Sequence, residues 1–230
     1  LDVTLAVLRN SFGQAVVPVF TAPEKIISLR LNVRGSEFSY GSKFDASVAI
    51  TNNSSEPLVV SDDGLFTGHL RIDANITGDL NKKIPNLVSV KIRPASPLKP
   101  AGSFFFPLRL LTTELRHLLL TYPQASVDIE FTAYLDPVIT AKGPTNRLPG
   151  IKPAKVVVKR PGVKLTGKFL RNRFSSLTKG RQGQKIRTAQ LFTGLLAEQH
   201  AMANREPLYK FMYADWMPDL LKSALLHSLN

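Results

Sequence analysis

Five segments in the first 140 residues of this chain alternate between apolar and polar side chains. In 44–51, for example, Phe44, Ala46, Val48 and Ile50 occupy every second position. A two-residue period is the pattern of a β-strand with one dry and one solvated face, whereas an amphipathic helix has a period of 3.6 residues. The other four segments are 27–34, 70–77, 88–93 and 127–134.

Turn-forming residues separate these segments, as in Asn52–Pro57 and Ser61–Gly64. Longer loops are expected at 78–85 and 94–102. Short antiparallel strands joined in this way predict a β-sandwich over residues 1–140, the main part of a mainly β fold with α. Two further edge strands are expected at 3–8 and 15–20.

One segment of this half has helical spacing instead. Leu115, Leu118 and Leu119 lie three and four residues apart within 112–120, and Thr112 or Thr113 is suited to cap the helix. We expect a short helix here that closes one end of the core.

Together, the strand 44–51, the turn Asn52-Asn53-Ser54, the loop 98–102 before an apolar strand, and the closing strand 127–134 resemble the pattern of bacterial immunoglobulin-like accessory domains. The resemblance implies an immunoglobulin-like β-sandwich whose role is to bind, space or support other modules. The chain has no cysteine, so the Cys…Trp…Cys framework of antibody domains is absent.

The positive charge is concentrated in one region. Between Asp136 and Glu198 lie 61 residues without Asp or Glu, and they carry 14 Lys and Arg, from Lys142 to Arg187. The rest has 16 basic and 17 acidic residues, so the net charge of +13 comes from this stretch. Pro and Gly interrupt it, which favours a connection over 141–184 that holds one short strand, 155–159, and one short helix, 168–179.

This basic stretch has three interpretations. Solvated linkers are often basic, so it can be a connection that only faces water. It can instead bind a polyanion such as nucleic acid, with release of counterions, or an anionic lipid surface or acidic glycan. The candidate contacts for a polyanion are Lys155, Lys159, Arg160, Lys164, Lys168, Arg171 and Arg173.

Residues 185–230 have helical patterns. Ile186, Ala189, Phe192, Leu196 and Ala203 trace one face, and a second pattern runs from Leu208 to Trp216. A third helix is expected after Pro218, because proline suits the first position of a helix. Helices this short cannot bury themselves, so they either pack on the sandwich or open a helical array that resembles HEAT or TPR repeats.

The sequence contains no nucleotide-binding motif, and its four histidines lie far apart. We therefore predict no catalytic residue, no metal site and no cofactor. No apolar run approaches the roughly 18 residues that a transmembrane helix needs.

The favoured hypothesis is a non-catalytic protein-binding or scaffold module. Because the chain begins at Leu1 without Met, we expect it to be part of a larger multidomain protein. The first alternative is a polyanion-binding module that uses the basic 142–187 segment. The second is an enzyme with a site between the two units, which convergent Asp, His and Ser side chains would reveal. The compartment stays open between a bacterial cell envelope and the cytoplasm, and the oligomeric state stays open too.

Overall fold

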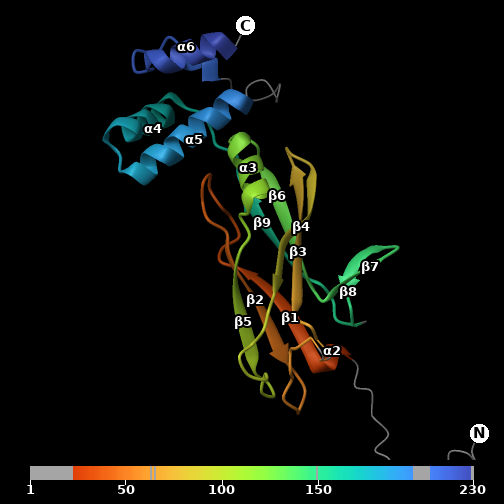
Figure 1. Ribbon diagram of the computed structural model, residues 1–230. Coiled ribbons are helices and arrows are strands. Elements are labelled where there is room, and N and C mark those ends of the chain that lie inside the picture. Colours follow the sequence, from red (N-terminus) through yellow and green to blue (C-terminus); the bar gives the residue numbers. More distant parts are fainter. Residues whose placement is uncertain (1–22, 63, 65, 149, 199–207, 229–230) are drawn as a thin grey trace, which may run out of the picture.

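The computed structural model describes residues 23–62, 64, 66–148, 150–198 and 208–228. The edge strands expected at 3–8 and 15–20 lie outside these residues. Two antiparallel sheets form an elongated body, and helices gather at one end of it (Figure 1). The prediction of a mainly β fold with a few helices is confirmed.

The first sheet has three strands in the order β1-β2-β5. These are β1 (Ile27–Val33), which the short helix α2 (Pro23–Ile26) precedes, β2 (Asp45–Asn52) and β5 (Ser103–Arg109). Leu29 pairs with Ile50, and Val48 pairs with Phe106, so the apolar positions of all three strands lie on one face. This face points into the core.

The second sheet has four strands in the order β4-β3-β6-β9. These are β3 (His69–Gly78), β4 (Lys82–Lys91), β6 (Val127–Leu135) and β9 (Ala154–Arg160). Ile72, Ile129 and Phe131 are fully buried and belong to the same hydrophobic cluster as the inner face of the first sheet. The two sheets therefore share one core, and we call residues 27–160 the sheet unit.

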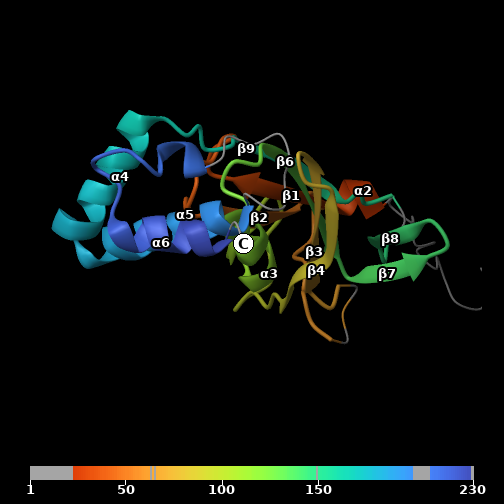
Figure 2. The same cartoon turned by 90° about the horizontal axis from the view of Figure 1, so that it is seen from above.

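A small hairpin, β7 (Pro137–Thr140) and β8 (Gly143–Asn146), projects sideways from the sheet unit, on the side opposite α4 and α5 (Figure 2). The side chain of Asn146 connects the hairpin to the sheet unit. It accepts a hydrogen bond from the Leu135 amide at 2.8 Å and donates one to the Ile151 carbonyl at 2.8 Å.

The predicted helix near 112–120 is present as α3 (Thr113–Thr121), and Leu115 and Leu119 bury its inner side in the sheet core. The remaining elements are α4 (Gly167–Lys179), α5 (Gln182–Glu198), the 3-10 helix η1 (Leu208–Phe211) and α6 (Asp219–Ser228), which we call the helical unit. It has its own cluster, in which the rings of Phe174 and Phe192 stack with centroids 4.3 Å apart. None of the described helices is both long and apolar enough to cross a membrane.

Several details differ from expectation. The loop expected at 78–85 is partly strand, since β4 begins at Lys82. The region expected as a connection, 141–184, holds β8, β9 and α4, and the strand predicted at 155–159 pairs with β6. Ala203 of the face predicted for α5 lies outside the described residues. At the other positions the prediction is partly wrong: Phe192 is buried as expected, but Ile186 is half exposed, and Leu191 and Leu195 are buried instead. The reason is that α5 packs against both α4 and α3, so its buried surface differs from a single stripe.

Two prolines lie in edge strands. The bonds from Leu110 N to Phe44 O and from Asn52 N to Gly102 O set the phase of the β2–β5 ladder, so the nitrogen of Pro107 faces the open edge of β5. Pro85 lies in β4 at a bulge opposite Asp73, beside Asn86 with a φ of 56°. Both positions suit a residue that has no amide to donate.

Candidate functional site

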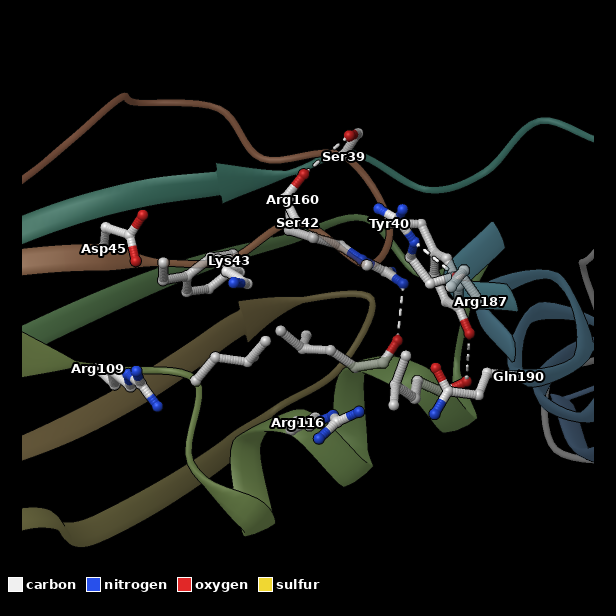
Figure 3. A pocket seen from close by; sticks show the side chains of 16 residues that line it. Ser39, Tyr40, Ser42, Lys43, Asp45, Arg109, Arg116, Arg160, Arg187 and Gln190 are labelled. Carbon is white, nitrogen blue, oxygen red and sulfur yellow. Dashed lines mark hydrogen bonds between the residues drawn. The ribbon is translucent and has the colours of Figure 1, made fainter. Parts of the chain in front are cut away.

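Two adjoining hollows lie where the loop between β1 and β2, the end of β5, α3 and α5 meet. Figure 3 shows the residues that line the larger of them. The larger has a volume of about 840 Å³ and the shallower about 550 Å³. They share the four residues Arg109, Leu111, Arg116 and Leu120. Together they form one groove between the sheet unit and the helical unit, which we call the basic groove.

The loop from Ser39 to Lys43 forms one wall of the groove. Phe38 and Phe44, at its two ends, are both buried, and their ring centroids lie 4.5 Å apart. The Ser42 amide donates to the Ser39 carbonyl at 3.0 Å, which closes the turn between them. The core therefore holds both ends of the loop, and exposed Lys43 stands at the rim.

Helix α3 forms the floor and second wall. Because Leu115 and Leu119 face the core, Arg116 faces solvent at the groove. The C-terminal end of the helix lies against Arg160, the last residue of β9, which donates to the carbonyl oxygens of Leu119 (2.8 Å), Tyr122 (2.9 Å) and Ala125. A cation at a helix C-terminus satisfies carbonyls that have no partner within the helix and opposes the helix dipole.

Helix α5 forms the third wall, and its C-terminal half is in close contact with the sheet unit. A Cβ placed on Gly194 would lie 2.1 Å from the Leu120 carbonyl oxygen, so only glycine permits this approach. Buried Glu198 accepts from the Gln124 amide at 2.9 and 3.1 Å. These contacts fix the direction of α5 and therefore the place of Arg187, nearer its N-terminal end.

Four exposed cations surround the groove: Lys43, Arg109, Arg116 and Arg187. Asp45 is the single carboxylate among the described residues that line it. In the part of the chain that the structure describes, none of the four cations forms an ion pair. The uncompensated charge makes the groove a region of positive potential, which raises the local concentration of anions.

Tyr40 lies deeper in the groove, where its hydroxyl donates to the Leu120 carbonyl at 3.3 Å and its ring lies 5.6 Å from the Arg160 guanidinium carbon. Burial raises the pKa of Tyr40 to about 12; the Arg160 charge acts in the opposite direction, and the Glu198 carboxylate adds to the rise. Tyr40 therefore stays neutral and acts as a hydrogen-bond donor at the base of the groove.

The candidate polyanion contacts from the sequence lie in three places. Lys155 and Lys159 are exposed on β9, and Lys155 pairs with Glu130 at 3.0 Å. Lys164 is exposed before α4, and the three remaining surface cations, Lys168, Arg171 and Arg173, are exposed on α4. Arg160 is 2% exposed and is bonded to the interior. Of the seven, Arg160 alone lines the groove.

Sequence reasoning missed Lys43, Arg109 and Arg116. Each stands singly in its own segment, and the fold brings them together. Arg187 belongs to the acid-free stretch, so its charge was visible in the sequence, but its neighbours in the groove were not. The burial of Arg160 had a signal: in β9, Val156, Val158 and Arg160 share the inward parity.

The groove offers anion recognition rather than a metal site. Among the described residues, no three His, Asp or Glu side chains gather closely enough to hold a metal ion. Guanidinium groups present several donors in a planar fork that matches carboxylate and phosphate oxygens.

No protein-family profile matches the sequence, and no curated protein is similar to it. Among solved structures, the CARDB domain of the PF1109 protein from Pyrococcus furiosus, determined with di-metal ions, is similar over 60% of this chain and 94% of its own, at 10% identity and a TM-score of 0.29. A protein from Archaeoglobus fulgidus is similar over 60% of this chain and 98% of its own, at 11% identity and a TM-score of 0.28.

A β-glucosidase from Listeria innocua in complex with laminaribiose is similar over 60% of this chain, at 11% identity and a TM-score of 0.30, but this chain spans only 16% of that enzyme. The neighbours include an immunoglobulin-like β-sandwich, the CARDB domain, and other β-rich folds. They do not support the expected HEAT-like or TPR-like unit.

Proposed function

We propose that this protein is a non-catalytic binding module that recognises an anionic ligand in the basic groove. The observation that carries the proposal is the set of four unpaired cations around a concave site with a single carboxylate. A scaffold surface would favour a smooth, uncharged groove, and this one is charged. The larger hollow, of about 840 Å³, lies within the range of about 300–1,000 Å³ that is usual for ligand sites.

In this proposal the sheet unit is an immunoglobulin-like sandwich that supports the site. In immunoglobulin domains the first, second and fifth strands share one sheet, and the third, sixth and seventh share the other. The sheets β1-β2-β5 and β4-β3-β6-β9 divide the strands in this way, with β4 beside β3. The protein would act as one module of a larger multidomain chain.

The enzyme alternative has less support. A catalytic constellation requires a nucleophile or base within hydrogen-bond reach of its partner. Among the described lining residues, Asp45 belongs to the larger hollow and His117 to the shallower one. The charge of the groove, rather than a titratable pair, is its distinguishing property.

Retention on heparin across a salt series tests the proposal. The groove variant Lys43→Glu/Arg116→Glu/Arg187→Glu reverses three cations of the groove. The variant Lys168→Glu/Arg171→Glu/Arg173→Glu reverses one Lys and two Arg on α4 and is matched in charge. We expect the groove variant to lose retention at salt concentrations where the α4 variant keeps most of it.

The salt dependence gives a second readout. Four phosphate-like contacts predict a slope of about −3 to −4 in a plot of log affinity against log salt, because each contact releases counterions. Far-UV circular dichroism of both variants reports whether they remain folded. Equal losses in the two variants would show that net charge alone drives retention, and loss only in the α4 variant would move the site to that helix; either result contradicts the proposal.

A further inference from the structure

The outer face of the three-stranded sheet adjoins the basic groove. Strand register places Arg34, Asp45 and Arg109 in one row across the sheet at the groove end, because the Arg34 amide donates to the Asp45 carbonyl at 3.0 Å and Asp45 pairs with Arg109. Two rows further on, Arg30 pairs with Ala49, and Ala49 pairs with Phe105. This outer face therefore carries three arginines and one exposed aromatic ring.

Phe105 is exposed although its strand neighbours are not. Its relative exposure is 62%, whereas Phe104 and Phe106 are partly buried and pack against the core from the opposite face of β5. The residue beside it on the central strand is Ala49, which is small and 4% exposed. No bulky side chain therefore stands between Phe105 and Arg30 on the central strand. A single exposed apolar residue needs no explanation, but an exposed ring on a sheet face that also carries arginines has the chemistry of a stacking platform.

The platform and the groove are continuous along β5. Phe105 and Arg109 lie on the same face of the strand, four residues apart, which corresponds to about 14 Å. Arg109 lines both hollows of the groove. A linear ligand that lies on Phe105 can therefore pass Arg109 and continue past Arg116 into the groove.

We infer that the anionic ligand is a single strand of nucleic acid, with a base stacked on Phe105 and its phosphates along Arg109 and the basic groove. This inference rests on the proposed function and adds the class of ligand to it. Sheet surfaces recognise single strands by stacking bases on exposed aromatic rings, while cations follow the backbone. A duplex keeps its bases paired and stacked, and an acidic glycan has no aromatic face to offer Phe105.

The experiment measures binding of fluorescent oligothymidylate and oligouridylate of about 12 nucleotides, a length within the usual site sizes of single-strand-binding domains. A duplex of the same length and heparin serve as further probes. The variants are Phe105→Ala, Phe105→Tyr, which keeps a ring, and Ile139→Ala. Ile139 is the matched control, since it is an apolar strand residue with 70% exposure on the distant hairpin.

We expect Phe105→Ala to weaken binding of the single strands about 5- to 150-fold, the range that the loss of one stacking contact produces. Phe105→Tyr and Ile139→Ala should bind as the wild type does. Heparin retention of Phe105→Ala should not change. In a salt series the alanine variant should keep the slope of the wild type and shift only the intercept, because stacking releases no counterions.

Three results would overturn the inference. Equal affinity for duplex and single strand would remove the role of exposed bases. An unchanged affinity of Phe105→Ala, with heparin retention still lost in the groove variant, would leave an anion-binding groove whose ligand is not a single strand. Failure of the wild type to bind either heparin or oligonucleotide would overturn the proposed function itself.

Discussion

The two hydrophobic cores of this protein are made of different side chains. The sheet core is mostly aliphatic and is arranged by strand register, as in the inward row of Ile72, Ala74 and Ile76. The helical core depends on a few large groups, with Phe174 stacked on Phe192 and Trp216 5.6 Å away. Register distributes the stability of the sheet unit over many contacts. The stability of the helical unit depends on a few aromatic rings and on the close contact between α5 and α3.

The largest expected effect separates the two cores directly. Phe131→Ala in β6 removes a fully buried ring and should cost about 3–5 kcal/mol of the free energy of unfolding. Phe192→Ala should cost a similar amount, but mainly within the helical unit. Trp216, the only tryptophan, lies in that unit, so its fluorescence reports on the helices, whereas the amide NMR signals of the strands report on the sheets.

In urea unfolding, Phe131→Ala should shift both signals, and Phe192→Ala should shift the fluorescence transition further than the transition of the strand amide signals. Identical shifts of both signals in both variants would mean that the two cores unfold as one cooperative body, and the comparison would fail.

Arg160→Ala should be the next largest change. It leaves three carbonyl oxygens, at the end of α3 and in the loop after it, without their charged donor, so we expect a loss of about 3–5 kcal/mol of the free energy of unfolding. Lys159→Ala, on the exposed side of the same strand, should change stability by less than about 1 kcal/mol. Chemical denaturation of both variants tests this difference, and equal losses would show that Arg160 has no special part in joining β9 to the end of α3.

Gly194→Ala tests the close contact between α5 and α3. Helix propensity alone would favour alanine by about 1 kcal/mol, but the new Cβ would meet the Leu120 carbonyl oxygen, so α5 must move. We expect a net loss of about 1–3 kcal/mol. The matched control is Gly183→Ala in the same helix, where nothing lies within 4 Å of the new Cβ and stability should rise or stay unchanged. Thermal unfolding of the two variants gives the sign of each stability change. Stabilisation by both substitutions would contradict a close contact between Gly194 and Leu120.

The smallest expected effect is one of pH. Because the pKa of Tyr40 is raised to about 12, the folded state favours the neutral phenol. Stability from this group is therefore complete below the unfolded pKa near 10 and falls as the pH rises toward 12. After allowance for solvent screening, we expect the free energy of unfolding to fall by about 1–2 kcal/mol over this pH range.

Tyr40→Phe should remove this part of the alkaline dependence. The measurement is the free energy of unfolding of wild type and variant at about pH 9 and about pH 11. A stability difference between the two proteins that stays constant over this interval would contradict the assignment.

Sequence alone predicted much of the sheet unit, because alternation specifies which face of a strand is buried. It predicted β1, β2, β3 and β6 nearly to their ends. The start of β4 was missed, since Pro85 and the bulge beside it look like a loop. The strand β5 was expected only as an apolar strand after 98–102, because the run Phe104-Phe105-Phe106 hides its alternation.

The groove could not be predicted in the same way. Its cations come from positions 43, 109, 116 and 187, and nothing local links them. The basic stretch between Asp136 and Glu198 led us to predict contacts at Lys155, Lys159 and α4. In the structure, the exposed charges of these residues lie outside the groove. Net charge is a property of composition, whereas a binding site is a property of which chain segments meet.

The prolines of the two edge strands have a consequence for the protein at high concentration. An open edge invites a second chain to extend the sheet and so begin an aggregate. Pro107 leaves a gap in the row of donors along β5, and Pro85 bends β4 at its bulge, with Lys82 and Lys83 nearby. Both edges therefore resist strand addition. We expect substitution of Pro107 by valine, a strong strand former, to shorten the lag before fibrils bind thioflavin T while leaving the native fold intact.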